Sequence, residues 1–248
     1  MSKLADAIRR SQRIEAAPMG FGAARPAPKP SMLAGALVGA AGVDAAAKAG
    51  ADFVLIDAFS TSLTPDDAKK ARTAAGDVPL GAGTKVADSA AAKALREAGI
   101  DFLVVDDSMP ASALLDEELG YVLTLPASPE ETFLRSLDAL SLEALYLSQV
   151  PSPLTVAGQL ELGRVAGMGH KPVLCLVESG ASADDLLCLR AAGVVAVLAS
   201  EGVDKLKASV AALPPRKTRR EERTVVSLPR GAAPTPGHDD DDDDDSLT

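Results

Sequence analysis

The sequence contains two similar stretches that indicate its fold, AGADFVLID at Ala49–Asp57 and AGIDFLVVD at Ala98–Asp106. In each, an Ala-Gly pair typical of a helix end precedes an apolar run that ends in an aspartate. Continuous apolar runs of this length are typical of parallel strands, because helices cover both faces of such a sheet. The two copies begin 49 residues apart, and a weaker copy, AAGVVAVLAS, begins at Ala191. The repeat predicts helix–strand units that recur along the chain.

The same unit, a short apolar strand followed by a polar turn and a stretch able to form a helix, occurs eight times. The predicted strands are Met32–Val38, Asp52–Asp57, Pro79–Gly83, Asp101–Asp106, Tyr121–Leu125, Ala144–Gln149, Pro172–Val177 and Val194–Ala199. Eight units are the number that closes an α/β fold into a (β/α)8 TIM barrel. An open doubly wound sheet would show the same alternation, but short units without a long insertion favour closure.

Three sequence boxes mark helix starts. Thr64–Asp67 and Ser128–Glu131 each offer a hydroxyl N-cap, a proline at the first helical position and an acid at the third. Ser182–Asp185 repeats the box without the proline. We therefore expect a helix to begin directly after the hydroxyl residue of each box.

The chain divides into three predicted parts. Residues 1–31 form an N-terminal extension, in which a helix carries Leu4 and Ile8 on one face and a Pro-rich segment follows. This helix would cover the bottom of the barrel or bind a partner. Residues 32–213 form the barrel. In residues 214–248, charge, proline and glycine leave too little apolar surface to offset the cost of ordering, so we expect a disordered tail that could dock on a protein partner.

Composition and charge narrow the class of protein. The formal net charge is −10, and the chain has five Phe, two Tyr and no Trp. An acidic chain with few aromatic platforms is unsuited to nucleic acid or to an anionic membrane. Without an apolar signal core or a spanning apolar run, it is expected to be cytoplasmic. Cys175 and Cys188 are expected to be buried free thiols. His238 and the run Asp239–Asp245 lack the spaced ligands of a shaped site, so no metal site is predicted.

In a TIM barrel, function lies at the carboxyl ends of the strands. The candidate catalytic residues there are Asp57, Lys85, Asp106 and Glu178. A lysine near carboxylates can donate a proton, contact a phosphate or, when desolvated, form a Schiff base. Lys85 could equally be a solvated loop lysine, and the two aspartates could be acceptors for loop N–H groups. Alternation puts the three carboxylates on one face of their strands, which is either the barrel interior or the helix layer.

The segment VESGASADDLLCLRAAGVVAVLAS (Val177–Ser200) resembles the last quarter of the phosphate-binding TIM barrels. In its Glu-Ser-Gly it is most similar to indole-3-glycerol phosphate synthase, and thiamine phosphate synthase-like barrels have the same layout. The resemblance implies that backbone N–H groups after strands seven and eight bind the phosphate of a substrate or cofactor. The matching residues are Ser179 and Gly180 after strand seven, with Ser200 and Gly202 after strand eight.

The same resemblance extends to Lys85, which lies near the strand-three lysine that acts as an acid in indole-3-glycerol phosphate synthase. It therefore implies the role of an acid for Lys85. Three features differ from the family. The lysine-rich start of strand one and the Asn-Arg signature of strand six are absent, and Glu201 follows Ser200 where related barrels have a small Gly-rich turn. Glu201 would place a carboxylate beside the predicted phosphate.

The sequence is compatible with three functions. The first is a lyase, isomerase or synthase that acts on a small phosphorylated metabolite at the carboxyl face and needs no cofactor. The second is a barrel without catalysis that serves as a binding or scaffold protein through its N-terminal helix and charged tail, and Glu201 favours it. The third is an FMN-dependent oxidoreductase, in which the FMN phosphate would lie after strands seven and eight.

Overall fold

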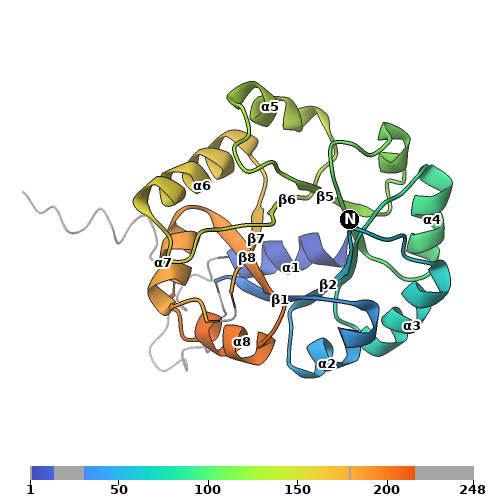
Figure 1. Cartoon of the computed structure of the whole chain (residues 1–248), viewed down its shortest axis with the longest axis horizontal. Helices are drawn as coiled ribbons and strands as arrows, with labels where there is room; N and C mark the ends of the chain where they lie inside the picture. The colour runs from blue at the N-terminus through green and yellow to red at the C-terminus, as the bar shows by residue number, and fades with distance from the viewer. Residues whose placement is uncertain (1, 14–30, 179, 216–248) are drawn as a thin grey trace, which may run out of the picture. The chain divides into compact units, whose positions relative to one another are not determined.

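The computed structural model describes residues 2–13, 31–178 and 180–215. They contain a closed barrel of eight parallel strands that pair in chain order (Figure 1). The strands are β1 (Leu33–Val38), β2 (Phe53–Ala58), β3 (Leu80–Thr84), β4 (Phe102–Val105), β5 (Gly120–Thr124), β6 (Ala144–Leu147), β7 (Val173–Leu176) and β8 (Val194–Ala199). The predicted barrel is confirmed, and β8 pairs with β1, which excludes the open sheet.

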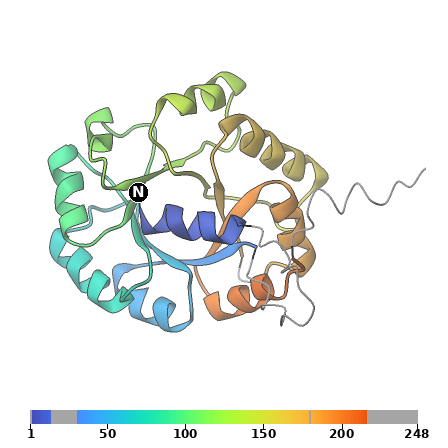
Figure 2. The same ribbon diagram turned by 180° about the vertical axis from the view of Figure 1, so that it is seen from behind.

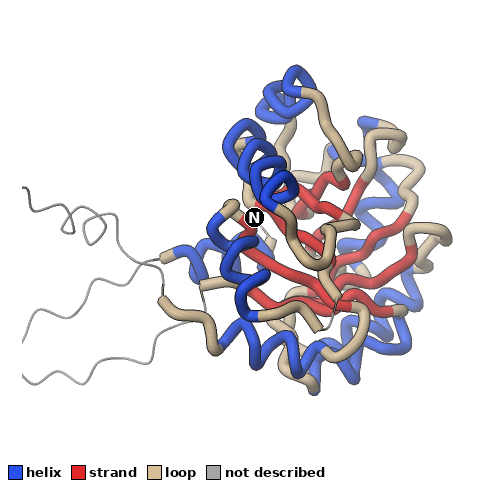
Figure 3. The backbone as a smooth tube through the Cα atoms, turned by 60° about the vertical axis from the view of Figure 1, so that its left-hand side comes forward, coloured by secondary structure: helices blue, strands red, loops and turns tan. Residues whose placement is uncertain are grey.

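The described residues also form helices, and all of them except α1 surround the strands on the outside of the barrel (Figure 3). They are α1 (Lys3–Gln12), η1 (Ala40–Gly42), α2 (Val43–Lys48), α3 (Pro65–Ala75), α4 (Ser89–Glu97), η2 (Ala111–Leu114), α5 (Glu131–Ser136), η3 (Leu137–Ala139), α6 (Val156–Gly169), α7 (Ala183–Ala191) and α8 (Val203–Ala211). Within the described ranges, none of these helices has the length and apolar character needed to cross a membrane. The Pro-rich segment and most of the predicted tail fall on residues 14–30 and 216–248, outside the described ranges.

The predicted strands agree with the observed ones to within two residues at either end. The connection between β4 and β5 differs from expectation, because residues 106–119 contain only the short 3-10 helix η2. Arg96 of α4 forms an ion pair with Asp116 in this connection, with 2.8 Å between Nε and Oδ2. Tyr121 donates its hydroxyl hydrogen to the carbonyl of Ala113, 2.9 Å away. These contacts hold a short segment against the barrel, where a full helix does not form.

The repeated segments owe part of their similarity to a structural role at the amino ends of the strands. Asp52 accepts a hydrogen bond of 2.9 Å from the backbone N–H of Ala34, on the preceding strand. Asp101 accepts one of 2.9 Å from the backbone N–H of Leu80, also on the preceding strand. Asp101 is further paired with the guanidinium of Arg72 at 2.9 Å. The aspartate ahead of each repeated strand therefore joins that strand to its neighbour.

The phenylalanines of the repeat fill the interior of the barrel. The rings of Phe53 and Phe102 meet edge to face, with 6.3 Å between their centroids. Gly35 on β1 and Gly81 on β3 provide the space, because a Cβ at either position would lie 2.4 Å and 2.2 Å, respectively, from the nearest ring atom. The interior is therefore a packed core, in which glycines on one strand accommodate rings from the next.

Helix α1 closes the amino end of the barrel (Figure 2). Leu4 and Ile8 lie one helical turn apart and are buried, at 0% and 2% exposure, within the interior cluster. Ser2 is the N-cap of the helix, and its backbone N–H donates a hydrogen bond of 2.9 Å to the Glu143 carboxylate, just before β6. Of the two positions left open by the sequence, the helix occupies the bottom of the barrel.

Two of the three expected helix starts are confirmed. Thr64 and Ser182 cap α3 and α7, and each hydroxyl accepts the N–H of the residue three positions on. The third expectation is wrong, because α5 begins at Glu131 with no side-chain cap. Pro129 is buried, and its carbonyl accepts a hydrogen bond of 2.6 Å from the guanidinium of Arg164 on α6. This tertiary contact coincides with an extended segment where the helix was expected to begin.

Both cysteines are free, as expected. Cys175 is fully buried on β7, and burial raises the pKa of its thiol to about 12. It is therefore a neutral, small apolar side chain at ordinary pH. Cys188 on α7 is only partly buried, so the expectation of burial was correct for the first thiol alone.

Candidate functional site

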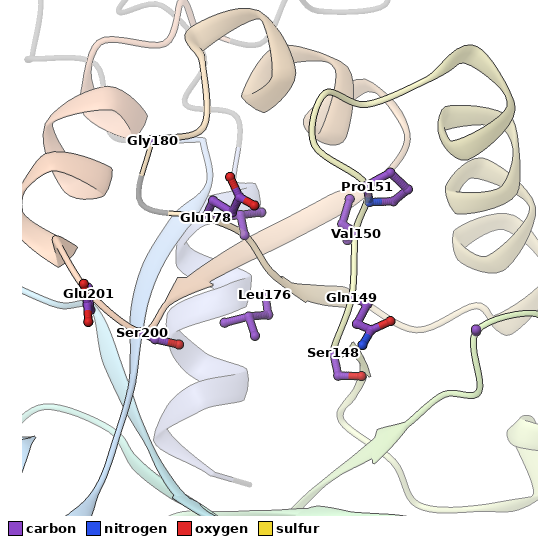
Figure 4. Close-up of a pocket in the computed structure, with 11 residues that line it drawn as sticks. Ser148, Gln149, Val150, Pro151, Leu176, Glu178, Gly180, Ser200 and Glu201 are labelled. Carbon is purple, nitrogen blue, oxygen red and sulfur yellow. The ribbon is translucent and has the colours of Figure 1, made fainter.

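An open cleft with a volume of about 910 Å³ lies at the carboxyl ends of β6, β7 and β8 (Figure 4). Its lining comes from the loops that follow these strands and from the segment after β5. The lining residues are Ala127, Ser148, Gln149, Val150, Pro151, Leu176, Val177, Glu178, Gly180, Ser200 and Glu201. The cleft is at the end of the barrel where the sequence predicts the site.

The loop that follows β6 forms one wall of the cleft and is tied to the start of α7. The backbone N–H of Leu154 donates a hydrogen bond of 3.2 Å to the carboxylate of Asp185. The Ser182 hydroxyl donates to the same carboxylate at 2.8 Å. The Ser182 and Leu154 hydrogen bonds lower the pKa of Asp185, because both favour its charged form. The wall is therefore anchored by a hydrogen bond from the loop after β6 to the first turn of α7.

The predicted phosphate-binding residues lie along this cleft to different degrees. Gly180 and Ser200 line it. Gly202 does not line it but is the N-cap of α8, with the left-handed φ of 62° that glycine adopts readily. The N-terminus of α8 has no side-chain cap, so its first N–H groups have no partner from a capping side chain. Ser179 lies outside the described residues.

The charges in the cleft are negative. Glu178 and Glu201 both line it and are both exposed. Neither forms an ion pair within the described residues, and no Lys, Arg or His of the described residues lines the cleft. A phosphate bound here depends on backbone N–H groups and hydroxyls, and the two carboxylates repel it.

The other candidate residues lie at the carboxyl ends of β2, β3 and β4 and do not line the cleft. Leu55, two positions before Asp57 on β2, packs in the interior cluster, so Asp57 is on the interior face of its strand. Asp106 and Glu178 follow the ends of β4 and β7, where alternation no longer fixes the face of a residue. Lys85 is exposed and forms no ion pair with any described residue. Asp106 accepts a hydrogen bond of 2.9 Å from the backbone N–H of Ser108. It therefore has the alternative role that the sequence allowed, that of an acceptor for a loop N–H group.

Two aromatic residues that sequence reasoning missed lie at the mouth of the barrel. The rings of Phe59, in the loop after β2, and Tyr146, on β6, are parallel, with 6.2 Å between centroids. Gly83 on β3 makes room for Phe59, because a Cβ there would lie 2.3 Å from its ring. Thr84 holds the loop: its hydroxyl accepts the N–H of Leu63 at 3.0 Å. Phe59 therefore extends from the β2 loop across the mouth towards β6.

The alternation of interior positions contained a signal for both residues. Phe59 lies two residues after Asp57, and Tyr146 lies two residues after Ala144, which packs in the interior cluster. Side chains two residues apart on a strand share a face, so alternation predicts an interior position for both. Burial first, and the negative charge of Asp57 second, raise the pKa of the Tyr146 hydroxyl to about 12. Tyr146 therefore remains a neutral hydrogen-bond donor at ordinary pH.

Comparisons with known proteins bear on the fold. No protein-family model matches the sequence, and no curated protein sequence is similar to it. Among solved structures, KGPDC from Streptococcus mutans matches with a TM-score of 0.58 at 13% identity, over 72% of this chain and 98% of that one. Dihydropteroate synthase from Xanthomonas albilineans matches with 0.52 at 15%, over 80% and 94%. An HpcH/HpaI aldolase from Desulfitobacterium hafniense matches with 0.51 at 13%, over 82% and 95%.

Proposed function

We propose that this protein is an enzyme that acts on a small phosphorylated metabolite at the carboxyl face of the barrel, as a lyase, isomerase or synthase. The observation that carries the proposal is the open cleft of about 910 Å³ lined by Gly180 and Ser200. It lies in the region of the N-terminus of α8, which has no side-chain cap. Backbone N–H groups at a helix N-terminus favour a bound anion.

The proposal divides the carboxyl face into two working parts. The phosphate would bind at Gly180, Ser200 and the start of α8, with Ser179 as a further contact. The reacting part of the substrate would extend towards β2, β3 and β4. There Lys85 would act as proton donor or amine, and Asp57 or Asp106 would act as base. Glu178 is the alternative base, because it lines the cleft itself.

The resemblance of the last quarter of the sequence to phosphate-binding barrels supports this assignment, as does the kind of protein that shares the fold. One solved structure of KGPDC from Streptococcus mutans, with a TM-score of 0.56 at 12% identity, is a complex with D-ribose 5-phosphate. A phosphorylated sugar is therefore a reasonable first probe for this chain. Indole-3-glycerol phosphate synthase and thiamine phosphate synthase-like activities belong to the set of reactions to be tested.

The experiment is a thermal-unfolding titration with inorganic phosphate and with ribose 5-phosphate. Ligand at ten times its Kd stabilises the folded protein by roughly 1.4 kcal/mol, so Tm rises. Gly180→Asp should abolish the rise, because the new carboxylate enters the phosphate position. A Cβ at Gly180 has nothing within 4 Å, so the variant should fold.

Gly163→Asp is the matched control. Gly163 is exposed on α6, and a Cβ there also has nothing within 4 Å. This variant should keep the response of the wild-type protein to both ligands. No change in Tm at millimolar ligand would contradict the phosphate site.

The scaffold function remains the second candidate because of one observation, the carboxylates of Glu178 and Glu201 in the cleft, which form no ion pair with any described residue. A protein with this function would bind neither probe. An FMN-dependent oxidoreductase would bind the FMN phosphate in the same place. A flavin absorption spectrum in the purified protein would identify that third function.

A further inference from the structure

The hydroxyl group of Tyr146 is not used by the fold. The residue is 1% exposed, and no described residue forms a hydrogen bond with its hydroxyl. Every fully buried side-chain nitrogen or oxygen in the described ranges has a hydrogen-bond partner. The Tyr146 oxygen therefore lies at the boundary of the buried interior rather than fully within it, and the residue as a whole is almost completely enclosed. A ligand that reached this oxygen would make the hydrogen bond that the described residues leave unmade.

The ring of Tyr146 lies against a residue from the carboxyl end of the barrel. Burial first, and the charge of Asp57 at the carboxyl end of β2 second, raise the pKa of the Tyr146 hydroxyl. The ring is held by its parallel contact with Phe59, from the loop after β2. Both neighbours belong to the carboxyl end, opposite the end closed by α1.

Tyr146 lies close to the lining of the cleft along β6. Ser148 lines the cleft and lies two residues after Tyr146, a rise of about 7 Å along an extended chain. Leu176 also lines the cleft and lies two residues after Leu174, which is the strand partner of Tyr146. Tyr146 therefore lies one layer below the lining of the cleft, towards the interior of the barrel.

We propose that Tyr146 is a ligand-contacting residue that donates a hydrogen bond to an oxygen of the substrate's carbon skeleton, while Asp57 accepts one from a neighbouring hydroxyl. The ligand class is a phosphate ester whose skeleton carries hydroxyl or carbonyl oxygens. This inference rests on the proposed function and extends it from the phosphate to the rest of the substrate. Phe59 is the positioning residue, because its ring fixes that of Tyr146.

The test uses the two tyrosines of the chain as a matched pair. Tyr146→Phe removes the hydroxyl and keeps the ring that packs on Phe59. Tyr121→Phe makes the same chemical change where the hydroxyl bonds the carbonyl of Ala113, within the outer core. Binding of ribose 5-phosphate and of inorganic phosphate is measured by calorimetry for the wild-type protein and both variants.

We expect Tyr146→Phe to weaken ribose 5-phosphate binding by roughly fivefold to tenfold, the range of one hydrogen bond, and to leave phosphate binding unchanged. Tyr121→Phe should bind both probes as the wild-type protein does. Equal ribose 5-phosphate affinity in the Tyr146→Phe variant and the wild-type protein would overturn the role of Tyr146 alone. So would a wild-type protein that binds ribose 5-phosphate no tighter than phosphate. A wild-type protein that binds neither probe contradicts the proposed function, and the role of Tyr146 with it.

A spectroscopic measurement locates the contact. With the tyrosine ring carbons labelled, the chain gives two sets of signals, which the two variants assign. Ribose 5-phosphate should shift the Cζ signal of Tyr146 and leave that of Tyr121 in place. A shift of neither signal on saturation with a bound sugar phosphate would also contradict the contact.

Discussion

The backbone N–H of Ser2 donates a hydrogen bond of 2.9 Å to the carboxylate of Glu143, 141 residues further along the chain. The contact joins the first turn of α1 to the amino end of β6. It places the apolar face of the helix over the open end of the barrel. The amino end is therefore closed by the chain itself, and the carboxyl end is left for a ligand.

This closure makes Ile8 part of the barrel core. Ile8→Ala should lower the free energy of unfolding by about 2 to 4 kcal/mol, because it removes buried methyl groups and leaves a cavity against the interior cluster. Gln12→Ala, on the exposed side of the same helix, is the control and should change it by less than about 0.5 kcal/mol. Urea unfolding measures both variants. Equal stability of the two would show that α1 does not pack on the barrel in solution.

The pairing of glycines with rings predicts a severe effect of a single methyl group. A Cβ at residue 81 would lie 2.2 Å from the ring of Phe102. Gly81→Ala should therefore lower the free energy of unfolding by about 1 to 3 kcal/mol. Gly163→Ala, where a Cβ meets nothing within 4 Å, should instead stabilise α6 by about 0.5 to 1 kcal/mol. Denaturant midpoints compare the two.

A second substitution tests whether the ring of Phe102 causes the loss of stability. Adding Phe102→Leu to Gly81→Ala makes room for the new methyl group and should cost less than the sum of the two single changes. Simple additivity in a double-mutant cycle would mean that the ring of Phe102 is not the obstacle.

The raised pKa of Tyr146 predicts a loss of stability in alkali. The hydroxyl titrates at about 12 in the folded protein, against 10.0 without the protein environment. The folded state holds this proton more tightly, so its contribution is fully present below about pH 10 and is lost as the pH rises towards 12. Two pKa units correspond to at most roughly 3 kcal/mol.

The measurement is urea unfolding of the wild-type protein and Tyr146→Phe at pH 9 and at pH 11.5. The free energy of unfolding should fall more in the wild-type protein, since the variant lacks the titrating group. Cys175, whose pKa is also raised to about 12, is present in both and cancels in the comparison. The same fall in both proteins would contradict a perturbed tyrosine.

Removal of a carboxylate from the cleft should strengthen anion binding. Glu201→Gln eliminates one repulsive charge and should tighten ribose 5-phosphate binding by roughly threefold to fivefold, close to the ~1 kcal/mol by which two unit charges about 4 Å apart interact in bulk water. The gain should shrink in 1 M KCl, where the screening length falls to about 3 Å. Glu117→Gln, an exposed acid just before β5 at the amino end, should leave the affinity unchanged. Calorimetry at low and high salt measures the Kd of ribose 5-phosphate for each protein. An unaltered Kd for Glu201→Gln would mean that the anion binds elsewhere.

The strands and the barrel could be predicted because the determinants are local and repeated. Each copy of the repeat contains a helix end, an aspartate and an apolar run within one short stretch. The two aspartates, Asp52 and Asp101, have the same role, because each accepts a backbone N–H from the preceding strand. The start of α5 could not be predicted in this way. There the carbonyl of Pro129 bonds Arg164, 35 residues later, and such a contact has no local signature.

The candidate site could be predicted only in part, because some of its contacts join residues that are far apart in the sequence. Gly180, Ser200 and Glu178 line the cleft because each follows a strand that the sequence identifies. Phe59 and Tyr146 meet across the mouth of the barrel, and their contact depends on the diameter of the barrel and on the space above a glycine. Alternation indicates which face each residue takes, but not what it meets on the other side.

The most direct test of the central claim is a crystal structure of the full chain soaked with ribose 5-phosphate. We expect the phosphate to lie within about 3 Å of backbone N–H groups at Gly180 and the start of α8, with the sugar extending towards Tyr146. A sugar phosphate bound away from the carboxyl ends of β6 to β8, with this cleft empty, would contradict the claim.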